Sequence, residues 1–140
     1  MSDLTVTASD VAAVQIFEQW TAPAAETFSA GEAIRLDTST GKATPGNATG
    51  AAEARVTGIA IETANVANET ITIVKRGILD LGDALDSLDY DAAVYLSNTD
   101  GTLGTAAATV SIIVGRVVPG WGHTTADKLL WVDLPADTDT

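Results

Sequence analysis

The chain has 140 residues, 46% of them hydrophobic and 19% charged, which is long enough for one domain with a buried core. Seven Lys and Arg stand against 19 Asp and Glu, giving a formal net charge of −12. Phosphate binding needs clustered basic residues, so this balance argues against nucleic acid and anionic membranes as partners. The lack of cysteine excludes disulfides and thiolate metal sites. The first residues lack the pattern of a signal peptide, so we expect a soluble protein made in the cytoplasm.

Residues 1–27 differ in pattern from the rest of the chain. The apolar residues between positions 11 and 20 come close to a helical stripe, whereas those between 4 and 8 alternate as in a strand. A short helix and an extended arm therefore both remain open, and so does a first strand packed on its own domain. If the segment is an arm that reaches a neighbouring subunit, its candidate contact residues are Leu4, Val6, Val11, Val14, Ile16, Phe17 and Trp20.

Residues 28–134 have the pattern of a β domain. Glycine-containing turns separate short runs rich in β-branched residues, and little of the sequence favours helix. Strands are expected at residues 33–37, 54–62, 70–75, 77–81, 92–97, 109–118 and 128–134. This organisation predicts an all-β fold, either a small sandwich or a small barrel, and the pattern leaves both open. Residues 135–140 are expected to form a disordered acidic tail.

The second half of this domain repeats the first. Three segments recur in the same order and at nearly constant spacing: Ala33–Leu36 as Ala93–Leu96, Val56–Ala60 as Ile113–Val117, and Ile71–Val74 as Leu130–Asp133. The two pseudo-repeats span about residues 31–75 and 91–134. A duplicated β unit can bury a core between its copies but brings no catalytic group with it. The repeat therefore favours a structural module.

No combination of residues indicates an enzyme. His123 is the only histidine, and no partner that would make it a general base can be recognised. Aspartates at positions 80, 83, 86 and 89 recur every third residue, which is not the spacing of an EF-hand loop. They are expected to form a solvated acidic edge that discourages aggregation. We predict no catalytic residue, no metal site and no cofactor.

The tryptophans are the more informative side chains. Trp121 lies between two glycines in a loop, so we add it to the candidate contact residues, since aromatic side chains dominate many protein interfaces. Trp131 lies in an expected strand with Leu130 and Val132 on the opposite face. One of these two sets must face outward or into a subunit contact.

Several of these motifs resemble tailed-bacteriophage head decoration proteins, also called capsid cement proteins. They are Gly31–Leu36, Gly41–Ala43, Val56–Ala60 and Glu69–Val74, together with their counterparts in the second half. The resemblance covers roughly residues 28–134, and the family usually has glycine where this chain has Asn68 and Asp91. It implies a trimer on the outer capsid surface of the virion, made in the host cytoplasm. There it would clamp neighbouring major capsid subunits, with the N-terminal segment adding to capsid strands.

Two other functions remain open from the sequence. One is a different virion β module, associated with the tail or a fibre. The other is a carbohydrate-binding module that stacks sugars on Trp121 and on Tyr90 or Tyr95.

Overall fold

The computed structural model of the chain describes residues 3–120 and 128–134, and nearly all regular structure in them is β-strand. One turn of 3-10 helix, η1 (Ala8–Asp10), precedes the first strand. The strands are β1 (Val11–Pro23), β2 (Ala33–Leu36), β3 (Ala43–Pro45), β4 (Val56–Ala60), β5 (Thr70–Leu81), β6 (Ala93–Leu96), β7 (Leu103–Gly104), β8 (Ile113–Pro119) and β9 (Lys128–Asp133). The all-β prediction is confirmed.

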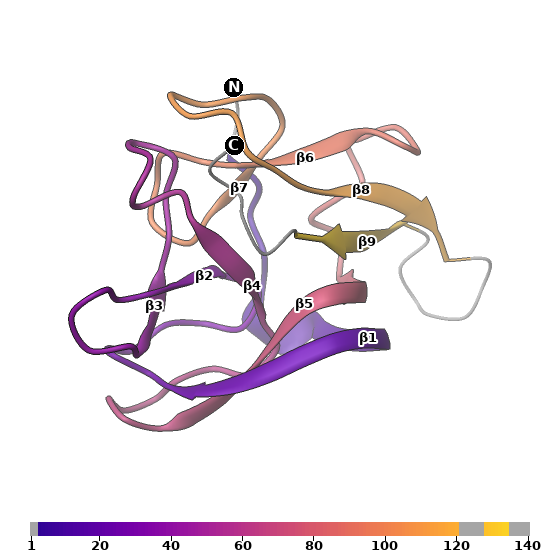
Figure 1. Ribbon diagram of the computed structural model, residues 1–140. Helices are drawn as coiled ribbons and strands as arrows, with labels where there is room; N and C mark the ends of the chain where they lie inside the picture. The colour runs from indigo at the N-terminus through magenta and orange to yellow at the C-terminus, as the bar shows by residue number, and fades with distance from the viewer. Residues whose placement is uncertain (1–2, 121–127, 135–140) are drawn as a thin grey trace.

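The strands form one curled antiparallel sheet, and the order of strands from one end of it is equivalent to the order from the other end (Figure 1). The order is β3-β2-β4-β5-β9-β8-β6-β7, so the first four strands mirror the last four, and β1 is added to β5. The halves join where residues 76–79 of β5 pair with residues 130–133 of β9. The two pseudo-repeats of the sequence are therefore two four-stranded units of the same topology.

The pairing register shows how closely the halves correspond. The register shift between Ile34 and Arg35 in β2 recurs in β6, between the residues that match them in the repeat. Ile59 pairs with Val74 as Arg116 pairs with Trp131, so the counterpart of Val74 is Trp131. The sequence alignment, which matched Val74 with Asp133, is therefore wrong in the last strand. Trp131 and Asp133 lie on the same face of β9, so both alignments satisfy the hydrophobic pattern.

Two non-glycine residues among those described have left-handed backbone. Asn68 has a φ of 72° and Asp91 a φ of 67°. Asn and Asp tolerate this region better than other non-glycine residues because their short polar side chains bond locally. Asp91 is the counterpart of Gly31, and the two amides donate to the equivalent carbonyls of Val117 and Ala60 at 2.7 Å. The turn is therefore the same in both halves.

The N-terminal segment is a strand of the sheet, not a helix or a projecting arm. β1 lies antiparallel along the whole length of β5, which is continuous where two strands were expected (Figure 1). Before β1, Asp3 forms a bridge with Gly104 in β7, and after it Ala24 forms a bridge with Ala43 in β3. The division expected near residue 27 thus does not separate the segment from the body.

Two hydrophobic clusters stabilise the fold. The main core combines buried residues of both halves, among them Ile59, Val74, Val94 and Leu130. The smaller cluster contains residues of the first half, such as Ile34 and Ile73, and of the segment around β1; Trp20 packs against it. The predicted acidic tail at 135–140 lies outside the described residues.

Candidate interaction surface

β1 is the open edge of the sheet. Within the described ranges it pairs with β5 alone, whereas each of the two strands that end the sheet, β3 and β7, also bridges the N-terminal segment. An edge strand presents unpaired backbone N–H and C=O groups that can bind a further strand. The N-terminal segment thus pairs with both end strands of the sheet. The longest strand, β1, has no strand paired with its other side in the described part of the chain.

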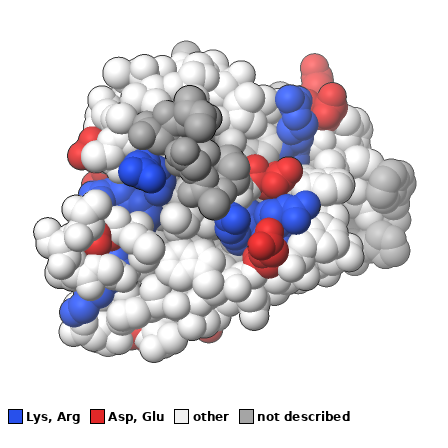
Figure 2. Space-filling model, viewed as in Figure 1, with Lys and Arg blue, Asp and Glu red and all other residues white. Residues whose placement is uncertain are grey.

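The open edge carries exposed apolar side chains. Val14, Ile16 and Phe17 are 40, 39 and 47% exposed, and Glu18 is the only charged residue of the strand. The pairing of β1 with β5 passes from Ala13 to Gln15 and from Ile16 to Glu18, so Val14 and Phe17 have no partner on β5. Such bulges twist an edge strand and redirect its side chains. Figure 2 shows a largely uncharged surface along the lower border, where β1 runs in Figure 1.

Phe17 connects this edge with the outer side of β9 and β8. Its ring lies 6.2 Å from the ring of Trp131, centroid to centroid, at an interplanar angle of 39°. Trp131 is 40% exposed and Ile113 on β8 is 43% exposed. We call Val14, Ile16, Phe17, Ile113 and Trp131 the outer apolar surface. Of the two sets of side chains on β9, Trp131 therefore faces outward, and Leu130 and Val132 face the core.

A groove of about 390 Å³ lies beside Trp131. It is lined by Asp91, Ile113, Gly115, Arg116, Val118, Trp131 and Asp133. An apolar centre with charged residues at its rim is the usual anatomy of a protein interface. The groove could therefore receive an apolar side chain of a partner.

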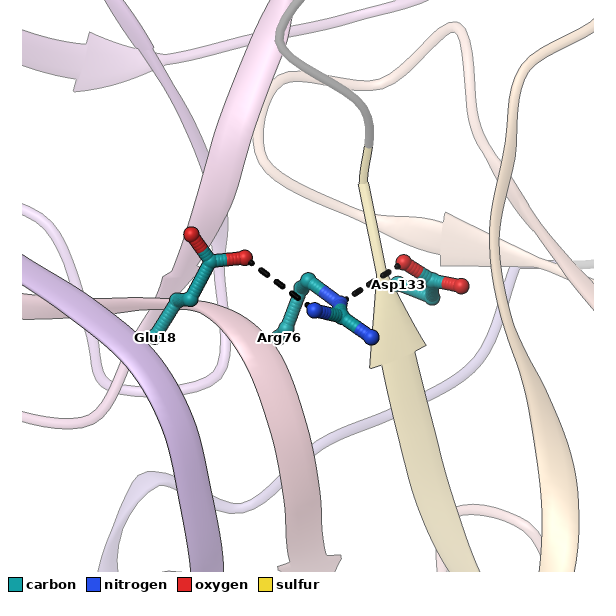
Figure 3. Close-up of polar contacts among 3 residues, drawn as sticks. All are labelled: Glu18, Arg76 and Asp133. Atoms are coloured by element: carbon teal, nitrogen blue, oxygen red, sulfur yellow. Dashed lines mark hydrogen bonds and ion pairs between the residues drawn. The ribbon is translucent and has the colours of Figure 1, made fainter.

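A row of three charged residues, Glu18, Arg76 and Asp133, crosses β1, β5 and β9 (Figure 3). Arg76 of β5 is paired in register with Glu18 of β1 and with Asp133 of β9. Its guanidinium lies 3.4 Å from the Glu18 carboxylate and 3.3 Å from that of Asp133. Exposed ion pairs of this kind contribute at most about 1 kcal/mol. Their consequence is local: they hold three charged side chains in one row beside the apolar surface.

The candidate contact residues from the sequence have different environments. Leu4 is buried in the main core, which removes it from any contact surface. Val6 and Val11 are half-buried against the same core. Trp20 is also half-buried, and its indole N–H donates to the Thr57 carbonyl at 3.4 Å. The exposed ones are Val14, Ile16 and Phe17, and Trp121 lies outside the described residues.

The sequence did not indicate that Ile113 belongs to the exposed surface, or that the rings of Trp131 and Phe17 are in contact. The alternation of β9 already indicated that Trp131 faces away from Leu130. No signal in the sequence places residue 17 beside residue 131, because that contact depends on β1 and β9 lying on either side of β5.

Of the two tyrosines considered as sugar platforms, Tyr90 is 48% exposed. The ammonium of Lys128 lies 5.2 Å from the ring centroid of Tyr90, the geometry of a cation–π contact. Tyr95 is half-buried in β6.

A second cavity, of about 400 Å³, lies where the halves meet near Glu32. Burial raises the pKa of the Glu32 carboxyl, opposed by the Ser29 amide, which donates to it at 2.5 Å. By contrast, the amides of Ser39 and Thr40 lower the pKa of the exposed Asp37. Over residues 3–120 and 128–134, no group of three or more His, Asp or Glu side chains is placed to hold a metal ion.

Glu32→Gln should stabilise the fold at pH 7, and the gain should shrink as the pH falls toward 4. Because burial raises the pKa of Glu32, the ionised carboxylate is disfavoured in the folded protein, and this cost vanishes once the group is protonated in both states. Urea unfolding of both proteins at several pH values measures the difference. A variant that is less stable at pH 7 would show that the bond from Ser29 outweighs burial.

Comparisons with known proteins give no family: no family model matches the chain, and no curated protein matches it. In the part of the chain that the structure describes, no helix is long and apolar enough to span a membrane.

Proposed function

We propose that the protein is a bacteriophage structural protein that binds the outer surface of the capsid and clamps neighbouring major capsid subunits. The observation that carries this proposal is the open β1 edge with Val14, Ile16 and Phe17 exposed along it. An extended segment of a capsid subunit can add to this edge through backbone hydrogen bonds and bury the three side chains. The resemblance of the sequence to decoration proteins supplies the partner.

The same resemblance suggests a homotrimer on the virion surface. Three copies would present three β1 edges to the shell at once. A contact that is weak for each copy then becomes tight, because the second and third binding events are intramolecular. Each copy would have to bury on the order of 1,000 Å² to form a specific interface.

Replacing Val14 and Ile16 together by lysine should weaken capsid binding at least tenfold. Lysines block the addition of a strand to an edge, and their charges would be buried in the contact. The measurement is co-sedimentation with capsids that lack the protein, together with the temperature at which the decorated capsids break open. Circular dichroism should show that the variant stays folded, because both side chains are exposed.

The matched control is Leu36→Lys with Val66→Lys, which adds the same charge at two exposed apolar residues away from β1. It should bind like the unchanged protein. Equal binding by the β1 variant would refute the role of the edge, and no binding by the unchanged protein would refute the proposed function. Imaging of labelled protein on intact virions separates attachment to the head from attachment to the tail.

A further inference from the structure

The two halves of the protein bury different faces of the same sheet unit. In the first half, one face carries Val56, Ile59 and Val74, which belong to the main core and are at most 1% exposed. The other face carries Ile34, Ala60 and Ile73, which form the smaller cluster with the segment around β1. Both faces of the first half are therefore covered.

In the second half, one face belongs to the main core, and the other is exposed over the residues that the structure describes. The counterparts of Ile34, Ala60 and Ile73 belong to the main core; they are Val94, Val117 and Leu130. The counterparts of Val56, Ile59 and Val74 are exposed; they are Ile113, Arg116 and Trp131. The halves thus pack front to back: the front of the first half, the face with Val56, Ile59 and Val74, meets the back of the second. Within residues 3–120 and 128–134, the front of the second half has only Phe17 of β1 in ring contact with Trp131.

From this mismatch we infer that the front of the second half is a docking surface for an aliphatic β-sheet face of a different protein. This inference rests on the proposed function, in which that protein is the major capsid subunit. In the first half, the same face is covered by aliphatic strand residues such as Val94 and Leu130. The repeat therefore indicates the chemistry of the cover: branched aliphatic side chains that enter the groove beside Trp131.

A second copy of the chain does not fit this position well. Its faces that correspond to the cover, around Ile34 and around Val94, are already buried within it. The charges that border the groove are already paired within the chain: Asp133 lies 3.3 Å from Arg76, and Asp91 lies 3.9 Å from Arg116. The apolar residues Ile113 and Trp131 are therefore what the groove offers to a partner.

Ile113→Lys tests the inference, and Leu36→Lys is its control, because the two leucine-sized residues are exposed to 43 and 41%. We expect the Ile113 variant to bind capsids at least tenfold more weakly and the Leu36 variant to bind normally. Both should keep the melting temperature of the unchanged protein within a few degrees.

A second measurement does not depend on the effect of a buried charge. Because the chain has no cysteine, Ile113→Cys and Leu36→Cys each provide one site for a photo-crosslinker. On decorated capsids, we expect the Ile113 site to crosslink to the capsid subunit and the Leu36 site to give no such product. Crosslinking to another copy, or no crosslink from Ile113 on capsids that bind normally, would overturn the inference. If the β1 variants lose binding and the Ile113 variants do not, the proposed function stands and this inference falls.

Discussion

Gly115→Ala should lower the stability of the fold by about 3 kcal/mol or more, the range of severe core substitutions. A Cβ atom at Gly115 would overlap the carbonyl oxygen of Trp131 on the neighbouring strand and lie 2.9 Å from its carbonyl carbon. Both are backbone atoms, so β8 and β9 would have to separate. For a chain of this length, the change corresponds to a fall in melting temperature of roughly 10 °C.

The internal repeat provides graded controls for this prediction. At Gly58, the counterpart of Gly115, a Cβ would lie 2.6 Å from the Val74 carbonyl oxygen, a smaller overlap. At Gly41 no atom lies within 4 Å, and only its φ of 73° disfavours alanine, by roughly 1–2 kcal/mol. Thermal unfolding should therefore rank the alanine variants Gly115, Gly58 and Gly41, from most to least damaging. Equal loss at Gly115 and Gly41 would contradict the close approach of β8 and β9.

Deletion of residues 2–20 should abolish folding rather than detach an arm. The deletion removes Leu4 from the main core, Trp20 from the smaller cluster and most of β1 from β5. Loss of one large core side chain alone costs about 2–5 kcal/mol, which approaches the whole stability of many domains. We expect the truncated chain to lose the β-sheet signal in circular dichroism and to aggregate.

The control for the deletion keeps the strand and changes its exposed side chains. Serine at Val14, Ile16 and Phe17 should leave the chain folded, because these residues belong to neither hydrophobic cluster. It should nevertheless weaken capsid binding. A folded, stable truncated chain would show that β1 does not belong to the sheet in solution and would restore the arm as the better description.

Part of the candidate surface could be derived from the sequence and part could not. The pattern of residues 11–20 singled out Val14, Ile16 and Phe17 as contact candidates, and the structure exposes all three. The same reasoning included Leu4, which is buried, because periodicity reports that a residue is apolar and not which surface covers it. The open front of the second half has only a partial sequence signature: Arg116 stands where the first half has the buried Ile59, whereas Ile113 and Trp131 are apolar like their buried counterparts Val56 and Val74.

The sequence by itself determined the β class, the repeat and the turns, because alternation, β-branched residues and turn-forming Gly, Asn and Asp act within a few residues of chain. Tertiary structure alone decided that β1 lies on β5, that Trp131 is the counterpart of Val74, and that the halves pack front to back. Each of these depends on which of several equally apolar surfaces meet. That choice is made by the burial of whole faces against one another, and no local stretch of residues encodes it.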